Sequence, residues 1–357
     1  MTRPSILVMA GGTGGHIFPG LAVAEYLRIC GWNVSWLGNQ HGMEYRLVKS
    51  CNFPFEAIEF GGLRGKGLKA KAMLPFNLMR ACFQSWKILR RIKPSVVLGM
   101  GGYITFPGGL VTKLLKRPLV LHESNSIAGS ANRALAKIAM RTLTGFPNTM
   151  AHAEWVGNPI RAEFDHIPAP ALRYEQRQGP LSILVVGGSL GAAALNENIP
   201  AALAFIPEDS RPHIIHQAGD KHLDELQQRY ADAGVTADIR PFIDDMPAAY
   251  AQADLVICRS GAMTVSELAA CGVASCLIPF PFAIDDHQTA NAQFLSDADA
   301  AILLPQQYLN PQDLALMIQN LSRADLKEMA LRAHALAKPD ATQRVAEVCA
   351  DCAGVGI

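Results

Sequence analysis

Glycines surround one histidine near the start of the chain, in the run Gly11-Gly12-Thr13-Gly14-Gly15-His16. Because glycine has no side chain, such a run lets backbone N–H groups approach an anion closely, especially where a helix begins. His16 would add an imidazole that can exchange protons near neutral pH, although a lone histidine can also be purely structural. The run therefore predicts a phosphate-binding loop with a candidate acid or base at its end.

The same run does not fit the common nucleotide-binding motifs. No Gly-Lys-Ser or Gly-Lys-Thr follows it, so it is not a Walker A loop. Ile17 stands where the GxGxxG pattern needs its last glycine. The next apolar run, residues 34–37, ends in Gly38 and not in an acid that could bind ribose. A nicotinamide cofactor is therefore not expected.

Three further segments combine glycine with polar groups, and each follows an apolar run: Gly99-Met100-Gly101-Gly102-Tyr103, His122-Glu123-Ser124-Asn125 and residues 258–267. Glu123 is the only acidic residue between positions 60 and 153, where it could orient or deprotonate a hydroxyl, or simply begin a helix. In the third segment a Ser-Gly turn precedes a helix whose N-terminus could hold a diphosphate. Glu267 would then lie about a turn into that helix, within reach of ribose hydroxyls.

Short apolar runs that end in glycine or a polar residue predict the strands that position these segments. The first run recurs half a chain later, since residues 5–12 and 182–189 are nearly the same. Strands are expected near residues 5–10, 33–37, 55–58, 95–99, 118–122, 141–144, 182–187, 213–217, 237–240, 254–258, 274–278 and 300–304. Helical stretches alternate with them, which predicts an α/β protein with two doubly wound parallel sheets that bind ligands at their carboxyl ends.

The two halves of the chain differ in charge. Residues 1–160 hold 19 Lys and Arg against 6 Asp and Glu, whereas the remainder holds 13 against 25. A basic half favours an anionic partner, such as a lipid surface, a phosphate-bearing substrate or nucleic acid, or it forms a solvated basic face. The proline-rich segment 157–180 indicates a connector. We expect an N-terminal domain over 1–158, a C-terminal domain over 159–338 and a terminal helix within 339–357 that crosses back.

A basic and aromatic stretch predicts a membrane-facing helix in the first half. A helix over about residues 70–92 would turn one face to the core, made of Leu74, Leu78, Cys82, Ser85, Leu89 and Ile92. Aromatic and basic side chains gather elsewhere on its surface: Phe76, Met79, Arg80, Phe83, Trp86 and Lys87. Such a surface is typical of proteins that lie on anionic lipid headgroups, and the alternative is that both faces are buried.

The cysteines and the hydropathy exclude several other classes of protein. The eight cysteines are scattered among apolar neighbours and no secretory signal precedes them, so reduced thiols are expected. Cys349 and Cys352 form a CxxC pair without a second ligand pair, which is too little for a structural zinc site. No apolar stretch reaches the roughly 18 to 20 residues that span a bilayer.

The chain resembles the MurG family at these segments and along its whole length. The motifs that carry the resemblance are Gly11–His16, Gly99–Tyr103, His122-Glu123-x-Asn125, Val156–Arg161, Gly187-Gly188-Ser189-x-Gly191-Ala192, Phe242–Met246 and Arg259–Glu267. Members of this family are bacterial N-acetylglucosaminyltransferases that convert the undecaprenyl-linked muramoyl-pentapeptide lipid I into lipid II. The family pattern often has glutamine where this chain has Ser124 and Leu190, and it differs in detail over residues 281–287.

The resemblance implies a GT-B fold, with two Rossmann-like domains facing across a cleft, and an inverting reaction that needs neither a metal nor a cofactor. The donor would be UDP-N-acetylglucosamine, contacted by Thr13, Gly14, Gly15, Asn125, Arg161, Ser189, Ile243, Ala262, Met263, Thr264, Val265, Ser266, Glu267 and Gln288. The acceptor diphosphate would meet Gly14, His16, Gly101, Gly102 and Tyr103. His16 is the hypothesised base that deprotonates the muramoyl 4-hydroxyl, and Glu123 is its rival.

The resemblance also implies partners and a location. The partners are lipid I, the anionic cytoplasmic surface of the cell inner membrane and other proteins of cell-wall synthesis or division, but no nucleic acid. Two other functions stay open at this point. A UDP-N-acetylglucosamine 2-epimerase shares the fold and the donor but needs no lipid acceptor, which leaves the basic aromatic helix unexplained. A non-catalytic membrane scaffold would give no reason for a second glycine-rich loop with a histidine.

Overall fold

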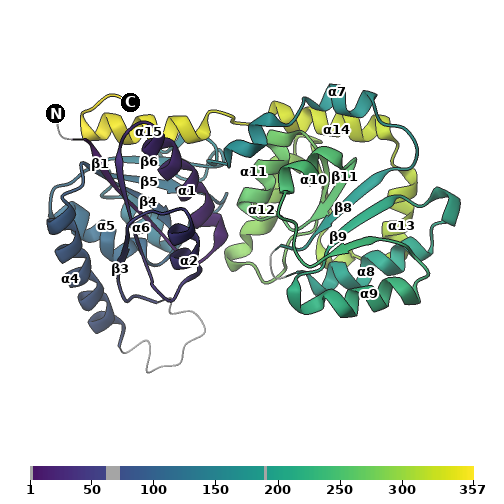
Figure 1. Cartoon of the computed structure of the whole chain (residues 1–357), viewed down its shortest axis with the longest axis horizontal. Helices are drawn as coiled ribbons and strands as arrows, with labels where there is room; N and C mark the ends of the chain where they lie inside the picture. Colours follow the sequence, from purple (N-terminus) through teal and green to yellow (C-terminus); the bar gives the residue numbers. More distant parts are fainter. Residues whose placement is uncertain (1–2, 62–72, 189–190) are drawn as a thin grey trace. The chain divides into compact units, whose positions relative to one another are not determined.

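The computed structural model describes residues 3–61, 73–188 and 191–357 (Figure 1). The chain divides into two compact units. The first is made of residues 1–161 and 338–357, and the second of residues 162–337. Each unit contains one sheet in which all paired strands run parallel. The predicted fold class, α/β with two doubly wound parallel sheets, is therefore confirmed.

The first unit has seven strands within the described ranges, in the order β3-β2-β1-β4-β5-β6-β7. These are β1 (Ser5–Ala10), β2 (Asn33–Gly38), β3 (Phe55–Ala57), β4 (Val96–Gly101), β5 (Leu119–Glu123), β6 (Arg141–Thr144) and β7 (Glu154–Trp155). The helices described around them are α1 (Gly14–Ile29), α2 (Met43–Ser50), α4 (Leu74–Ile92), α5 (Thr105–Leu114), α6 (Ser130–Ala136) and α15 (Ala341–Ala353). Because β1 pairs with β4, the loops that follow these two strands lie side by side.

Strand β1 shows why this sheet needs helices on both faces. Ile6 and Val8 belong to a core cluster that also contains residues of α1 and α15, whereas Leu7 and Met9 belong to a second cluster with residues of α4 and α5. Successive side chains of a strand point to opposite faces, and all four are fully buried. A strand that is buried on both faces needs an uninterrupted apolar run, and Ser5–Ala10 provides one.

The second unit has six strands within the described ranges, in the order β10-β9-β8-β11-β12-β13. These are β8 (Ser182–Val186), β9 (His213–Gln217), β10 (Asp238–Arg240), β11 (Leu255–Cys258), β12 (Ala274–Leu277) and β13 (Ile302–Leu303). Its α-helices are α7 (Pro170–Glu175), α8 (Ala193–Ala204), α9 (Leu223–Asp232), α10 (Met246–Gln252), α11 (Ala262–Cys271), α12 (His287–Ser296), α13 (Pro311–Asn320) and α14 (Arg323–Ala335). Since β8 pairs with β11, the turns after both strands lie at the same edge of the sheet.

The first helix starts earlier than the sequence predicts. Helix α1 begins at Gly14, inside the run predicted to be a loop, so His16 lies in the first turn of the helix. Glycine is a poor helix former, which is why the sequence pattern favours a loop there. Thr13 takes the extended backbone conformation of an N-cap residue, and the first turn tolerates the two glycines that follow.

The segment 157–180, predicted to be a connector, is more structured than expected. It contains the 3₁₀ turn Ala162–His166 and helix α7. Strand β7 is missing from the prediction because a two-residue strand has no periodicity to detect. Helix α4 begins at Leu74, with Pro75 in its first turn, where a missing N–H costs nothing. The earlier part of the predicted helix falls among residues 62–72, outside the described residues.

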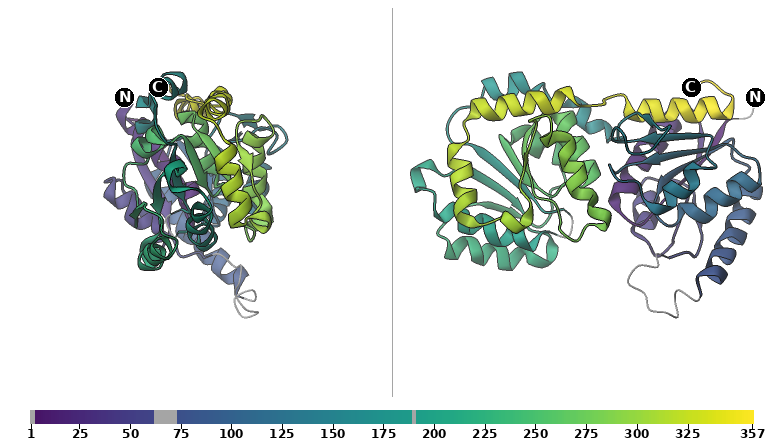
Figure 2. Two further views of the ribbon diagram at one scale, coloured as in Figure 1. Left: turned by 90° about the vertical axis from the view of Figure 1, so that its right-hand side faces the viewer. Right: turned by 180° about the vertical axis from the view of Figure 1, so that it is seen from behind.

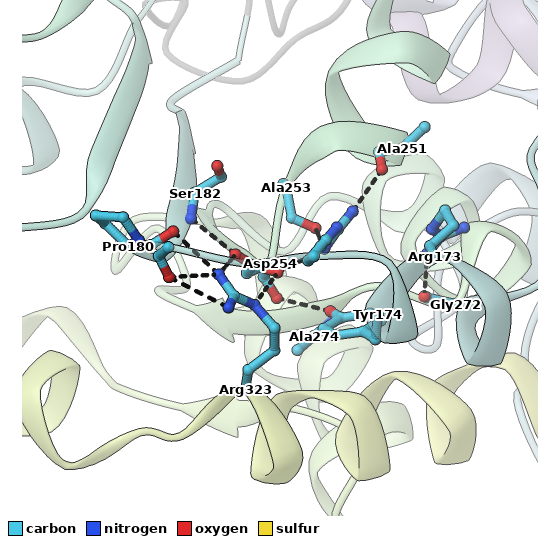
Figure 3. A network of polar contacts seen from close by, with 12 residues as sticks. Arg173, Tyr174, Pro180, Ser182, Ala251, Ala253, Asp254, Gly272, Ala274 and Arg323 are labelled. Atoms are coloured by element: carbon cyan, nitrogen blue, oxygen red, sulfur yellow. Dashed lines mark hydrogen bonds and ion pairs between the residues drawn. The ribbon is translucent and has the colours of Figure 1, made fainter.

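A buried carboxylate ties the second unit's first helix to its sheet. Asp254 is 1% exposed and receives hydrogen bonds from Ser182 N, at 2.8 Å, and from both Arg177 and Arg323. Figure 3 shows Arg323 and Ser182 converging on Asp254. Tyr174 of α7 donates its hydroxyl to the Asp254 carbonyl at 2.7 Å. This network explains why a proline-rich segment packs as part of the second unit.

The last helix, α15, returns to the first unit, as the right-hand view of Figure 2 also shows. Val345, Ala346 and Cys349 belong to the core cluster that contains residues of α1. Burial raises the pKa of the Cys349 thiol, as expected for a small core residue. Among the described residues, no cluster of His, Cys, Asp and Glu could hold a metal ion. None of the described helices is long and apolar enough to cross a membrane.

Candidate functional site

The two glycine-rich loops of the first unit touch one another. A Cβ atom placed on Gly102 would lie far inside 3.0 Å of the Gly11 carbonyl oxygen. A Cβ atom on Gly101 would lie 2.8 Å from the Cε1 and Nδ1 atoms of His16. The structure therefore brings together His16 and both predicted loops, and the contact depends on the absence of side chains at Gly101 and Gly102.

Helix α1 presents its N-terminus beside these loops. Thr13 accepts the first backbone hydrogen bonds, from His16 N at 3.1 Å and Ile17 N at 3.3 Å. The Thr13 side chain makes no capping hydrogen bond within the described part of the chain. Gly12 and Thr13 are exposed, and Gly14, Gly15 and His16 are half-buried. Such a terminus can offer backbone N–H groups and a partial positive charge to an anion.

Sequence reasoning missed a carboxylate beneath the first loop. Glu44 of α2 is fully buried, and it accepts hydrogen bonds from Asn39 N at 3.0 Å and Gly12 N at 3.4 Å. A Cβ atom on Gly11 would lie 2.5 Å from Glu44 Oε1. Glu44 therefore sets the backbone of the first loop. A glutamate near a helix start looks like an ordinary surface residue, so no local signal could have identified it.

Glu123 lies at the end of β5 and is 1% exposed. Its Oε1 atom accepts from Asn125 N at 3.0 Å and Asn125 Nδ2 at 3.3 Å. Its Oε2 atom accepts from Gly129 N at 3.0 Å and from Asn132 Nδ2 at 2.9 Å. Four donors thus hold this carboxylate, which in turn fixes the turn that carries Asn125. Asn132 was not anticipated from the sequence, because it lies in the middle of an ordinary helix.

Two of the predicted motifs, residues 122–125 and 156–161, contact each other directly in the first unit. His122 Nε2 donates to the Gly157 carbonyl at 2.9 Å, and Asn158 Nδ2 donates to the Ser124 carbonyl at 3.0 Å. Burial lowers the pKa of His122 to about 4, against the opposing effects of the Gly157 carbonyl and the Glu123 carboxylate. His122 is therefore neutral at physiological pH, and its role here is to attach β5 to the segment that leads to Arg161.

In the second unit, helix α11, which follows β11, carries six of the predicted donor residues. Helix α11 begins at Ala262 after the extended N-cap Gly261, which brings no side chain to the helix end. Met263, Thr264, Ser266 and Glu267 are half-buried, and Ala262 and Val265 are buried. Ser266 Oγ donates to the Ala262 carbonyl at 2.9 Å. The predicted contact Ser189 lies outside the described residues.

Gln288 is brought to the same turn. Ser260 Oγ donates to the Gln288 carbonyl at 2.8 Å, and Gln288 Oε1 accepts from Phe280 N at 2.9 Å. Ile243 is buried after β10, where its N–H donates to Gln217 Oε1 at 3.0 Å. Arg161 and Asn125, also predicted donor contacts, are half-buried residues of the first unit. The contacts therefore form two groups, one in each unit.

Helix α4 carries the predicted membrane-facing side chains. Phe76, Met79 and Phe83 are 58%, 65% and 54% exposed. Lys87 Nζ lies 4.6 Å from the centroid of the Phe83 ring, and Arg80 forms an exposed ion pair with Glu59. Trp86 differs from the rest, because it is half-buried against the core and stacks on Phe83 at 5.9 Å between ring centroids. The predicted core side of the helix does pack inward, with Ser85 and Leu89 buried.

Comparisons with known proteins match a family domain to each half of the chain. Residues 6–144 match the glycosyltransferase family 28 N-terminal domain, and residues 182–345 match the family's C-terminal domain. The UDP-N-acetylglucosamine--N-acetylmuramyl-(pentapeptide) pyrophosphoryl-undecaprenol N-acetylglucosamine transferase of Polynucleobacter asymbioticus is 87% identical over 357 residues, which is 100% of both chains. The enzyme of the same name from Cupriavidus metallidurans is 62% identical and covers 99% of each chain.

Solved structures place the fold in the same group of proteins. The crystal structure of Acinetobacter baumannii MurG has a TM-score of 0.86 and 42% sequence identity, over 97% of this chain and 99% of that one. The calicheamicin glycosyltransferase CalG4, at a TM-score of 0.67 and 13% identity over 99% of both chains, shares the fold alone.

Proposed function

Because the chain belongs to glycosyltransferase family 28, and within it to the MurG enzymes, we propose how its residues move N-acetylglucosamine from UDP-N-acetylglucosamine to lipid I and so form lipid II. The observation that carries this function is the 87% identity, over the whole chain, to a transferase named for that reaction. A UDP-N-acetylglucosamine 2-epimerase is not supported by these relatives. The protein is a glycosyltransferase of peptidoglycan synthesis with the GT-B architecture.

The reaction needs a stabilised leaving group. The muramoyl 4-hydroxyl attacks the anomeric carbon of the donor sugar, the bond from that carbon to the UDP oxygen breaks, and the configuration inverts. UDP departs with additional negative charge, which backbone N–H groups at a helix N-terminus stabilise. Helix α11, whose first turn is free of a capping side chain at Gly261, is suited to that role together with the turn after β8. We therefore expect transfer without a metal ion.

The ribose and the uracil of UDP are assigned to further residues of the predicted donor site. Glu267 lies in the second turn of α11 and is half-buried, so its carboxylate can accept hydrogen bonds from ribose hydroxyls. Ile243 and Arg161 are assigned to the uracil, and Gln288 to the donor sugar. Thr13, Gly14, Gly15 and Asn125 are assigned to the sugar and phosphate from the first unit.

His16 is the base in this proposal. The hydroxyl loses its proton as it attacks, and a group must accept that proton within hydrogen-bond reach. His16 lies in the first turn of α1, half-buried beside Gly101, and is assigned to the acceptor diphosphate with Gly14, Gly101, Gly102 and Tyr103. Glu123 is the weaker candidate, because four donors already occupy its carboxylate oxygens. Its role is to position the turn that carries Asn125.

The lipid acceptor requires contact with a membrane surface. Helix α4 supplies exposed Phe76, Met79 and Phe83, with basic Arg80 and Lys87 beside them. Apolar side chains that enter the headgroup boundary and cations that meet anionic lipids are the two usual components of such binding. We assign the protein to the cytoplasmic side of the inner membrane as a peripheral protein. Other proteins of cell-wall synthesis or division are expected partners.

The test is transfer of labelled N-acetylglucosamine from UDP to a lipid I analogue in the presence of EDTA. Labelled disaccharide lipid is the expected product. If UDP or epimerised sugar formed without the acceptor, and no disaccharide formed with it, the assignment would fail. His16→Ala should lose turnover while UDP binding persists. Near wild-type turnover in His16→Ala, with turnover abolished in Glu123→Ala, would transfer the role of base to Glu123.

A further inference from the structure

One buried amide joins the backbone at the ends of neighbouring strands in the second unit. Gln217 is the last residue of β9 and is 2% exposed. Its Nε2 atom donates to the Gly188 carbonyl at 2.9 Å, and its Oε1 atom accepts from Ile243 N at 3.0 Å. Strands β8 and β10 flank β9, so Gln217 links the turn after one neighbour to the segment after the other.

Both hydrogen bonds require the chemistry of a primary amide. The Ile243 N–H can only donate and the Gly188 carbonyl can only accept, so the bridging side chain must offer one acceptor and one donor. A carboxylate supplies acceptors alone, and an ammonium group supplies donors alone. Among side chains of this length, glutamine satisfies both backbone groups at once.

The backbone around Gln217 is held by other contacts as well. Ala218 N donates to the Arg240 carbonyl at 2.8 Å, and Gly219 N donates to the Pro241 carbonyl at 3.1 Å. Asn196 of α8 donates to the Ala218 carbonyl at 3.2 Å. The loss of the Gln217 amide should therefore leave the end of β9 in place and release only the Gly188 turn and the Ile243 segment.

We propose that Gln217 is a positioning residue for the donor nucleotide, because it sets the spacing between the turn that receives the diphosphate and the segment that receives the uracil. The proposal rests on the donor site described above. UDP spans both segments, so its affinity depends on that spacing, whereas the lipid acceptor touches neither. Gln217 itself is buried and contacts no reacting atom.

Two substitutions test these hydrogen bonds, because one removes a single bond and the other removes both. Gln217→Glu keeps an acceptor for Ile243 but turns a carboxylate oxygen toward the Gly188 carbonyl, and Gln217→Met removes both bonds at similar length. Gln217→Glu leaves the Gly188 carbonyl without its donor, and Gln217→Met leaves both backbone partners unsatisfied, so each variant should bind UDP about tenfold or more weakly than wild type. The KM for UDP-N-acetylglucosamine should rise in parallel. The KM for a lipid I analogue, and kcat at saturating donor, should stay within about twofold of wild type.

A matched control comes from the other face of the same strand. His216 is adjacent to Gln217 and therefore points to the opposite side of the sheet, where its Nδ1 atom pairs with the Tyr230 hydroxyl at 2.9 Å. His216 is fully buried and Tyr230 is 2% exposed. Tyr230→Phe removes one buried hydrogen bond from β9 without touching Gly188 or Ile243. It should lower the unfolding temperature and leave the Kd for UDP unchanged.

The experiment is calorimetric titration of wild type and the three variants with UDP, together with thermal unfolding and transfer kinetics. The proposal is supported if both Gln217 variants bind UDP more weakly and Tyr230→Phe does not. A folded Gln217→Met protein with wild-type Kd for UDP would overturn it, and so would a wild-type Kd in Gln217→Glu at a pH where its carboxyl is ionised. Equal weakening by Tyr230→Phe would also overturn it, since general destabilisation would then be the cause. Failure of the wild type to bind UDP would instead refute the donor site.

Discussion

Replacing Gly102 by alanine should separate the two glycine-rich loops of the first unit. Gly102 has a φ of +84°, and a Cβ atom there would overlap the Gly11 carbonyl oxygen, with the Gly11 carbonyl carbon at 3.1 Å. The neighbour is backbone, so it cannot turn away as a flexible side chain would. The left-handed conformation alone costs an L-residue about 1–2 kcal/mol. In addition, the overlap must push the loop that contains Gly102 away from the loop that contains Gly11.

The size of the catalytic effect follows from that displacement. To accept a methyl group, the Gly11 carbonyl must retreat by about 1 Å, and a misplacement of that size can reduce a reaction rate on the order of 10²-fold. Both loops belong to the proposed acceptor site, and His16 lies against Gly101. We therefore expect kcat/KM for a lipid I analogue to fall by about 10²-fold, while the Kd for UDP changes little.

Gly31 provides the control for this substitution. It has the same φ, +84°, and lies in the same unit, and no atom of the described residues lies within 4 Å of the position of a Cβ atom. Gly31→Ala should therefore show the conformational cost of about 1–2 kcal/mol in urea unfolding and retain wild-type kinetics. The comparison uses urea unfolding and steady-state transfer for both variants. If the two variants had the same kinetics, contact between the loops would not be required for transfer.

Three further predictions concern the other polar and apolar clusters. Asp254→Ala should destabilise the second unit by about 3–5 kcal/mol in urea unfolding, because two arginines then lose a buried partner. Burial raises the pKa of Asp254, but hydrogen bonds from Arg323, Ser182 and Arg177 hold it below its ordinary value of 3.8. The wild type therefore has this stability in full above about pH 4 and loses it as the pH falls further. If the free energy of unfolding of Asp254→Ala fell with decreasing pH as it does in the wild type, this reasoning would be contradicted. Glu123→Gln should lower kcat/KM by about tenfold or more through weakened loop contacts but keep the shape of the pH profile, whereas loss of a titrating limb would identify Glu123 as the base. Phe83→Asp should reduce sedimentation with anionic vesicles, and Phe205→Asp, at an equal 54% exposure in the second unit, should not.

The parts of the fold that the sequence predicts best depend on uninterrupted or periodic apolar residues. The runs over β1 and β8 predict two buried parallel strands, and the core side of α4 follows from helical spacing. Side-chain exposure on that helix is harder to predict. Trp86 was grouped with the membrane-facing residues, yet it is half-buried, because a large ring at the edge of a helix face can reach the core.

The residues that set the site were not predicted, for a physical reason. Glu44 reaches a backbone group 32 positions away, and Gln217 reaches one 26 positions away. Each lies among other polar residues of a short helix or strand, so nothing in the local sequence pattern distinguishes it from a surface residue. Glycines are easier to find, since several together interrupt an apolar run. Sequence analysis therefore identified the loops but not the side chains that hold them.

The internal repeat in the sequence becomes a repeat of backbone geometry. The first residues after β1 and β8 are Gly11 and Gly187, and neither has room for a Cβ atom. The Glu44 side chain occupies that space at Gly11, and the backbone of Ala192 occupies it at Gly187. The second residues, Gly12 and Gly188, have φ values of +93° and +92° and are exposed. Among the described residues, no atom lies closer than 3.6 Å to a Cβ position on Gly12 or within 4 Å of one on Gly188. In each unit one glycine allows close packing and the next leaves backbone open to a ligand. We infer from the proposed function that this strand-turn unit serves the acceptor diphosphate in the first unit and UDP in the second, with the buried side chains of Glu44 and Gln217 fixing the backbone of each turn.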